Sequence, residues 1–226
     1  MTGTSAREQS QAGDARRREG RHGILGGTFN PPHVGHMALA RSALDGLALE
    51  RVWLMPVSEP VHKTGELDPG AAHRLAMCKL AAAGEPGVGV CTLEVERGGR
   101  SYTVESLRAI HASHPDAQLT FIVGADTAAA LPDWREPLAV LELCELAVAA
   151  RTGTAREMVL DTLARLGGPA AGERVRFLQM PAIDVSSSQA RERAARGAST
   201  AGLLNAEVAG YIEAHALYRD AVEAQR

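Results

Sequence analysis

The stretch that decides the fold reads Gly23-Ile24-Leu25-Gly26-Gly27-Thr28-Phe29-Asn30-Pro31-Pro32-His33-Val34-Gly35-His36. It starts with a short apolar run, 23–26, which is typical of a buried strand and stops at a pair of glycines. Residues 35–44 then have the pattern of a helix. A strand, a glycine-rich loop and a helix in this order predict one unit of a parallel α/β sheet.

The same alternation of strands and helices continues toward the C-terminus. It predicts an α/β fold, with a Rossmann-like doubly wound parallel sheet flanked by helices and a small helical part at the C-terminus. Pro69 suits the first turn of its helix. In such sheets ligands bind beyond the carboxyl ends of the strands, so the chemistry is expected there. The further strands are expected at 51–55, 88–91, 119–123, 146–149 and 175–178, and the further helices at 69–83, 103–112, 187–196 and 205–216.

The composition favours one domain. With 226 residues, 45% of them hydrophobic, the chain can build one sizeable core. We expect a single domain over 21–218, with a helical portion from about 186, and a short tail over 219–226. Residues 1–20 carry almost no large apolar side chain and are expected to form a disordered tail. The arginines at 16–18 are either solvated or a phosphate-binding patch.

Charge and cysteine usage narrow the function classes. A net charge of −3 provides no strong field for nucleic acid or a membrane surface. No apolar run approaches the roughly 20 residues that cross a bilayer. Cys78, Cys91 and Cys144 are scattered without metal-ligand spacing, which favours a reducing cytoplasm. The oligomeric state is left open, a homo-oligomer included.

The loop between the first strand and its helix has the residue types of a phosphate site. Gly26 and Gly27 let backbone N–H groups approach a ligand closely. His33 and His36 are three residues apart across the helix start, so both rings can face one side. The start of a helix attracts phosphate, and imidazoles there can donate to charge that develops during nucleotidyl transfer. The alternative is a pair of capping or metal-binding histidines, although no further metal ligand is evident nearby.

This glycine-rich loop with His-x-Gly-His resembles the signature of a nucleotidyltransferase superfamily. Six other motifs are similar to those of its bacterial nicotinate mononucleotide adenylyltransferases, and the resemblance runs from residue 23 to about 218. Asn30 stands where Asp is frequent in that family, and Val61 where a second proline is usual. In the last of the six motifs Val185 and Ser188 replace the commoner Ile and Thr. The six motifs are Pro56 to Lys63, Arg74-x-x-Met77, Ser101-Tyr102-Thr103, Gly124-x-Asp126, Leu131-Pro132-Asp133-Trp134-Arg135 and Ile183 to Arg191.

The resemblance implies a role for each motif, beside a purely structural alternative. By this resemblance His33 and His36 would be the catalytic residues. Tyr102, Thr103 and Trp134 would bind nicotinate mononucleotide, although Thr103 also suits an N-cap. ATP would be bound by Gly26, Gly27, Thr28, Phe29, Lys63, Gly124, Asp126, Ser186, Ser187, Ser188 and Arg191.

Several of these residues have plain alternatives. Lys63 also fits an ordinary surface lysine, and Asp126 a helix cap. Ser186 with Gln189 fits a capping box. Arg74 either braces the phosphate region or is an exposed helix arginine. Trp134 lies in a polar, proline-flanked stretch, where a place in the core is less natural than for Trp53 in its strand.

The implied reaction joins the AMP part of ATP to nicotinate mononucleotide and releases pyrophosphate. No protein nucleophile is needed, because the 5′-phosphate attacks the α-phosphorus directly. Mg²⁺ is expected to arrive with the triphosphate. Two rivals stay open: a related transferase that makes dephospho-coenzyme A or a cytidylyl product, and a non-catalytic nucleotide sensor on the same fold.

Overall fold

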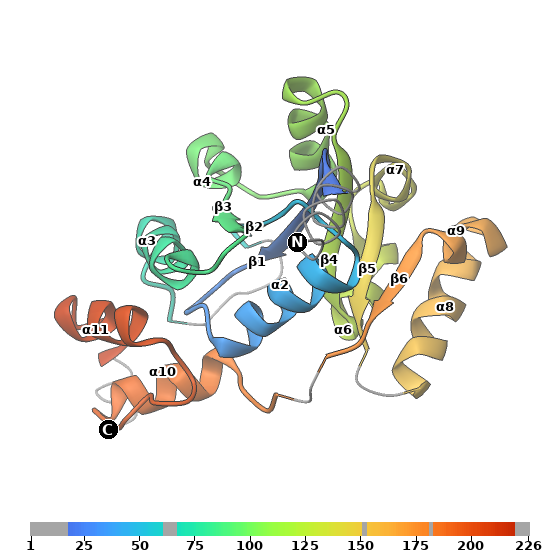
Figure 1. The fold of residues 1–226 in the computed structure, drawn as a ribbon. Coiled ribbons are helices and arrows are strands. Elements are labelled where there is room, and N and C mark those ends of the chain that lie inside the picture. Colours follow the sequence, from blue (N-terminus) through green and yellow to red (C-terminus); the bar gives the residue numbers. More distant parts are fainter. Residues whose placement is uncertain (1–17, 61–66, 151–152, 181–182, 220–226) are drawn as a thin grey trace, which may run out of the picture.

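The computed structural model describes residues 18–60, 67–150, 153–180 and 183–219, so most of both expected tails lies outside the described residues. Within them six parallel strands form one sheet in the order β3-β2-β1-β4-β5-β6 (Figure 1). This order confirms the predicted Rossmann-like sheet. The strands are β1 (Arg21–Gly27), β2 (Arg51–Pro56), β3 (Val88–Val90), β4 (Gln118–Gly124), β5 (Glu145–Ala149) and β6 (Val175–Leu178).

The strand order reverses beside β1. Chain order runs outward from β1 to β2 and β3 on one side, and from β4 to β5 and β6 on the other. Connections therefore leave the carboxyl ends of β1 and β4 on opposite faces of the sheet, which opens a crevice for a ligand between them. Gly27 and Gly124, the last residues of these strands, border that crevice.

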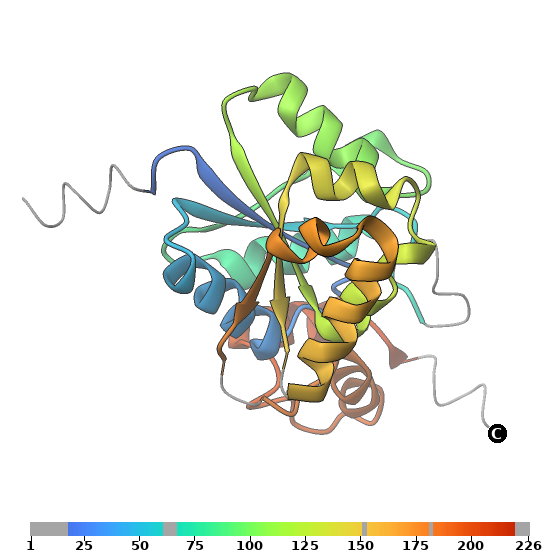
Figure 2. The ribbon, with the colours of Figure 1, turned by 90° about the vertical axis from the view of Figure 1, so that its right-hand side faces the viewer.

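Two apolar clusters lie on the two faces of the sheet. Helices cover both faces (Figure 2). Leu25, Leu54 and Ile122 face one cluster together with helices α2 (Val34–Gly46), α3 (Ala71–Ala82) and α11 (Ala206–Ala214). Ile24 and Phe121 face the other. Successive strand residues thus point to opposite faces, and both faces are buried as parallel sheets require. The second face is covered by α5 (Thr103–Ser113), α7 (Pro137–Leu143), α8 (Gly153–Gly167) and α9 (Pro169–Glu173).

Most predicted elements are confirmed within a few residues, with one clear correction. The helix expected from Pro69 begins at Ala71, because Gly70 caps it with a φ of 97° that no helical residue adopts. In the described part of the chain, six further elements between β3 and β6 were not predicted. All except α8, which has 15 residues, are seven residues or shorter, so their periods are too brief to read. Besides α7, α8 and α9 they are α4 (Leu93–Arg97), α6 (Ala125–Ala129) and the 3-10 turn η1 (Leu131–Asp133).

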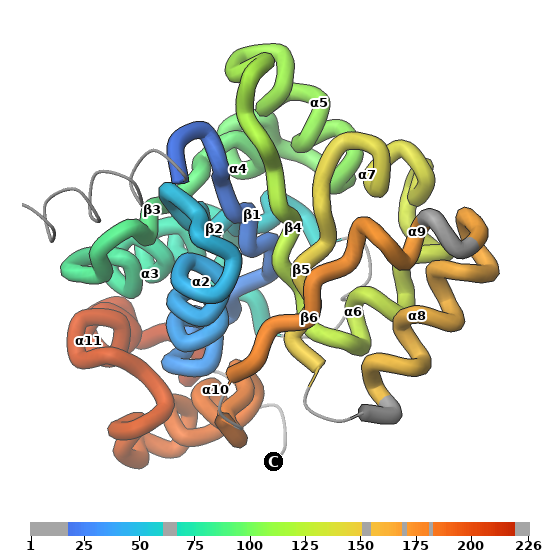
Figure 3. The backbone as a smooth tube through the Cα atoms, turned by 45° about the vertical axis from the view of Figure 1, so that its right-hand side comes forward, coloured from blue at the N-terminus to red at the C-terminus, as the bar shows by residue number. Residues whose placement is uncertain are grey.

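The C-terminal helices return to the first unit of the fold. Helix α10 (Ser187–Ala195) and α11 lie beside α2 and α3 (Figure 3). The N–H of Val34, the first residue of α2, donates to the carbonyl of Leu203 at 2.9 Å. Residues some 170 positions apart thus meet at the start of α2. Among the described residues, no helix has the length and apolar character needed to cross a membrane.

Candidate active site

The two histidines of the first loop stack at the start of α2. His33 is the N-cap, and its N–H donates to Nδ1 of His36 at 3.2 Å. Because Nδ1 of His36 accepts this bond, neutral His36 carries its proton on Nε2. The ring centroids lie 3.7 Å apart, which confirms that both side chains face one side. We call residues 26–36 the histidine loop.

His33 differs from His36 in its surroundings. Burial lowers the pKa of His33 to about 4, so the ring is neutral near pH 7. Its Nδ1 is buried and has no hydrogen-bond partner among the described residues. Glycine at position 35 lets the His33 ring pack close to the helix backbone, since a Cβ on Gly35 would lie 3.0 Å from His33 Nδ1. The His-x-Gly-His spacing therefore has a packing reason as well as a chemical one.

Packing inside the protein accounts for glycine at positions 26 and 27. A Cβ at Gly26 would lie 2.6 Å from the ring of Phe121, and one at Gly27 would lie 3.3 Å from the ring of Phe29. The Phe29 ring also meets His36 edge-on, with centroids 4.9 Å apart. Phe29 has a φ of 52°, a conformation that persists only where its surroundings hold it. These glycines let two aromatic rings support the histidine loop.

The start of α2 offers fewer backbone donors than the sequence indicated. The N–H groups of His33, Val34 and His36 donate to His36 Nδ1, the Leu203 carbonyl and the His33 carbonyl. No described residue accepts from the N–H of Gly35, so α2 presents two imidazoles and one backbone donor. The phosphate site expected at this helix start therefore depends on the imidazoles and on Gly35, because the returning chain and the histidine pair use the other N–H groups.

The start of α10 has the opposite character. Ser186 and Gln189 form the predicted capping box, with distances of 2.9 and 3.2 Å, and this confirms the capping interpretation. No described residue accepts a hydrogen bond from the N–H of Ser187 or Ser188. Two backbone donors at the positive end of a nine-residue helix make an anion site.

Helix α10 packs directly on the histidine loop. Ser187 Oγ donates to the carbonyl of Pro31 at 2.9 Å. Arg191 donates to the carbonyl of Asn30 at 2.8 Å and to Ser188 Oγ at 3.1 Å. The structure thus joins two motifs that lie more than 150 residues apart in the sequence.

Arg74 braces the loops that follow β1 and β2. Its side chain is fully buried, and Nε pairs with Asp68 at 2.9 Å. Its other nitrogens donate to the carbonyls of Thr28, Val57 and Ser58 at 3.1, 2.6 and 2.7 Å. The structure therefore selects the bracing role for Arg74 over the exposed one. Lys63, which follows these loops, lies outside the described residues, as does Val61.

The remaining predicted ATP residues lie at the end of β4. Gly124 is the N-cap of α6, and Asp126 is the second residue of that helix with an exposed side chain. The cap interpretation of Asp126 is wrong, because the cap position falls two residues earlier and has no side-chain bond.

Tyr102, Thr103 and Trp134 lie on neighbouring elements. Tyr102, not Thr103, is the N-cap of α5, and Thr103 is its first residue. Trp134 is half-buried and meets Phe121 edge-on at 5.8 Å, so it packs partly on the core where the sequence suggested a less buried place. Arg135 connects the two elements, since its guanidinium lies 4.8 Å over the Tyr102 ring and pairs with the carboxylate of Glu105 at 2.7 Å.

Glu94, which the sequence analysis did not single out, is a buried carboxylate that bonds to α5. Ser106 donates to Glu94 at 2.6 Å, and Arg97 donates to the same hydroxyl at 3.2 Å. Burial raises the pKa of Glu94, whose residue is 3% exposed. The signal in the sequence was an acidic residue inside the apolar run Leu93-Glu94-Val95.

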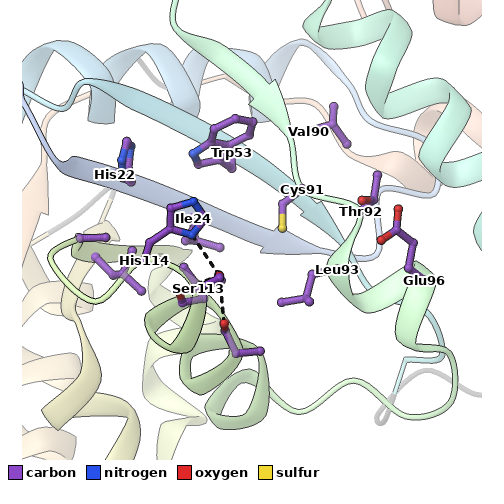
Figure 4. A pocket seen from close by; sticks show the side chains of 14 residues that line it. His22, Ile24, Trp53, Val90, Cys91, Thr92, Leu93, Glu96, Ser113 and His114 are labelled. Carbon is purple, nitrogen blue, oxygen red and sulfur yellow. Dashed lines mark hydrogen bonds between the residues drawn. The ribbon is translucent and has the colours of Figure 1, made fainter.

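A cavity of about 400 Å³ lies elsewhere, on the sheet face between α4 and α5 (Figure 4). None of the residues that the sequence singled out for chemistry lines it. Its walls include His22, Trp53, Cys91, Glu96, Ser113 and His114.

Among the described residues, no group of three or more His, Cys, Asp or Glu side chains could hold a metal ion. The donors that converge at the crevice are hydroxyls, imidazoles and backbone N–H groups. This donor set suits the oxygens of a polyphosphate rather than a cation.

Comparison with known proteins agrees with this geometry. The Cytidylyltransferase-like family model matches residues 24–193. The "Probable nicotinate-nucleotide adenylyltransferase" of Bordetella petrii is 43% identical over 201 residues, which cover 88% of this chain and 99% of the relative. The protein of the same description from Thermomicrobium roseum is 41% identical over 88% of this chain and 92% of its own length.

Solved structures show the same fold at lower identity. Nicotinic acid mononucleotide adenylyltransferase of Plasmodium falciparum, complexed with NaAD, superposes with a TM-score of 0.71 at 17% identity. The match covers 88% of this chain and 97% of that one. The chain therefore belongs to the cytidylyltransferase-like nucleotidyltransferases and, within them, to the nicotinate-nucleotide adenylyltransferase family.

Proposed function

We propose that this protein transfers the adenylyl group of MgATP to nicotinate mononucleotide, giving nicotinate adenine dinucleotide and pyrophosphate in NAD biosynthesis. One observation carries the proposal beyond family membership. The histidine pair and the open N–H groups of Ser187 and Ser188 meet at the carboxyl end of β1, where Ser187 contacts Pro31 at 2.9 Å. Two anion-binding elements that touch each other suit a triphosphate that spans both.

The reaction needs positioning and charge stabilisation rather than a protein nucleophile. The 5′-phosphate of the mononucleotide attacks the α-phosphorus of ATP in line, that P–O bond forms, and the bond to pyrophosphate breaks. His36 carries its proton on Nε2 and so donates to charge that grows on the α-phosphate. His33, neutral at pH 7, supplies a second polar ring beside it.

The ATP site combines both strand ends. Gly26, Gly27, Thr28 and Phe29 would line the α-phosphate and ribose. Ser186, Ser187, Ser188 and Arg191 would hold the β- and γ-phosphates, which also carry Mg²⁺. Lys63 would add a mobile positive charge. Gly124 and Asp126 would bind the nucleoside, with the carboxylate accepting from a hydroxyl.

The acceptor site lies at the start of α5. N–H groups there favour the carboxylate of the nicotinate ring, and the Glu105 carboxylate of the same turn is already paired with Arg135. Trp134 would stack on the ring. Three unpaired thiols, Cys78, Cys91 and Cys144, suit a reaction in the cytoplasm.

An acceptor-specificity assay tests the function. Pyrophosphate release with MgATP is measured for nicotinate mononucleotide, nicotinamide mononucleotide, phosphopantetheine and glycerol phosphate. We expect the acid to exceed the amide by far more than the 10- to 200-fold of a methylene-sized difference, or about 10³-fold or more in kcat/KM. Equal use of acid and amide would remove the nicotinate assignment, and release with none of the acceptors would favour the nucleotide sensor.

Trp134 offers a test of the acceptor site alone. Trp134→Ala removes a stacking face that cannot tell acid from amide, so KM for the mononucleotide should rise about fivefold while the acid preference persists. Trp53→Phe is the control, because Trp53 on β2 packs against the same apolar cluster as Trp134 but lines the separate cavity beside α4 and α5. An unchanged KM in Trp134→Ala would take this residue out of the site.

A further inference from the structure

The side chain of Asn30 ties the histidine loop to two distant parts of the chain. The residue is 2% exposed and lies three positions before His33. Its amide nitrogen donates to the carbonyl of Leu67 at 2.8 Å, and its amide oxygen accepts from the hydroxyl of Tyr218 at 2.8 Å. A buried amide with both ends used fixes its backbone, because releasing either bond leaves a buried polar group unpaired.

The same backbone holds Arg191. The carbonyl of Asn30 accepts from the Arg191 guanidinium at 2.8 Å. Any rotation of the Asn30 peptide therefore moves Arg191 together with the loop. Leu67 is followed by Asp68, which pairs with the buried Arg74, so the network continues beneath Thr28.

Tyr218 reaches this network from the end of the described chain. It is 6% exposed, packs in the apolar cluster with α2 and α11, and has a φ of 69°. A left-handed tyrosine is uncommon, and the surroundings must hold it there. Its hydroxyl donates to the side-chain oxygen of Asn30, a residue of the histidine loop that lies 188 positions earlier in the sequence.

We infer that Tyr218 is a positioning residue for catalysis: its hydroxyl sets the Asn30 peptide, and through it the histidine loop and Arg191. This inference rests on the proposed adenylyl transfer. It also gives a reason for Asn where Asp is frequent in the family, since an aspartate could accept from Tyr218 but could not donate to Leu67.

The chain offers a matched control in Tyr211. This second C-terminal tyrosine, on α11, also uses its hydroxyl to bond the body of the protein, at 3.0 Å from Nδ1 of His73 on α3. It does not touch the histidine loop. Tyr218→Phe and Tyr211→Phe therefore each delete one hydroxyl bond between the C-terminal part and the sheet domain.

The experiment compares both variants with the wild type on the acceptor that the wild type uses best, so that failure of the proposed acceptor leaves this test intact. We expect Tyr218→Phe to lower kcat about tenfold, the cost of one unpaired buried acceptor, with KM for the mononucleotide within twofold. Tyr211→Phe should keep the wild-type kcat. Similar kcat losses in both variants, or none in Tyr218→Phe, would overturn the inference.

A double-mutant cycle separates positioning from general loosening. If Tyr218 acts through Asn30, Tyr218→Phe should have little further effect on kcat in an Asn30→Ala background. Effects that multiply would show that Tyr218 acts by another route and would overturn the proposed connection. Thermal unfolding of each variant is recorded, and kcat is measured well below the lowest midpoint.

Discussion

Two helix starts meet at the active site, and they differ in what they present to a ligand. At α2 the N–H groups of His33, Val34 and His36 are used inside the protein, and what remains is two stacked imidazoles and the N–H of Gly35, from which no described residue accepts. At α10 the side chains are used in the cap and in contacts with the loop, while two N–H groups remain. Two helix starts that share a capping-box pattern thus supply mainly side-chain donors at one helix and backbone donors at the other. The comparison teaches that a helix start is an anion site only where its N–H groups have not found partners.

The largest expected effect concerns Arg74, which braces the loops that follow β1 and β2. Arg74→Met would leave Asp68 and the carbonyls of Thr28, Val57 and Ser58 without their buried donor. We expect a loss of about 3–5 kcal/mol in the free energy of unfolding, measured with urea. Arg41→Met is the control, because Arg41 pairs with Glu85 at an exposed position and should cost at most about 1 kcal/mol. Equal losses would show that the brace adds nothing beyond a surface ion pair.

The next effect tests the imidazoles of α2. His36→Ala should lower kcat by about 10²- to 10³-fold, as removal of one donor to a developing charge does. His36→Gln is the informative companion, since glutamine at this helix position can still accept from the His33 N–H and preserve the cap. Both variants should lose turnover while remaining folded. Near wild-type turnover in either would show that α2 contributes through its backbone, as α10 does.

A matched pair tests the backbone donors of α10. Ser187→Ala and Ser187→Pro both remove the hydroxyl that bonds Pro31, but only proline removes the N–H. Proline is well accepted as the first helical residue, and Ser186 before it is already extended. We expect KM for ATP to be at least about tenfold higher in Ser187→Pro than in Ser187→Ala, the worth of a bond to a charged group. Equal KM values would leave α10 with a structural role only.

The smallest expected effect is a pH dependence that belongs to α2 alone. Burial lowers the pKa of His33 from 6.5 to about 4, so the unfolded chain takes up a proton first as pH falls. The stability from neutral His33 is fully present above pH 6.5 and is lost as pH falls toward 4. By pH 5 the loss is at most about 2 kcal/mol, reduced by partial exposure. His33→Asn should flatten this part of the stability curve, whereas replacing the exposed His114 should not; matching curves would contradict the assignment.

The sequence was a good guide wherever a signal was local. The strand ending at Gly26-Gly27, the facing histidines and the Ser186–Gln189 capping box depend on residues a few positions apart, and all are confirmed. Errors arose where a distant residue intervened. The start of α2 was expected to attract phosphate, but the Leu203 carbonyl accepts from its first N–H, that of Val34.

The sequence by itself therefore determined the α/β class, the positions of the strands and the motifs that identify the family, because periodicity, glycines and caps act over one or two turns. Only the tertiary structure decided which motifs touch, that Arg74 lies buried, and that Tyr218 ends on Asn30. These contacts join positions 46 and 188 residues apart. The physical reason is that the folded sheet brings strand ends and the C-terminal part together, and this decides which groups form hydrogen bonds. Local sequence patterns do not indicate partners that are so far apart in the chain.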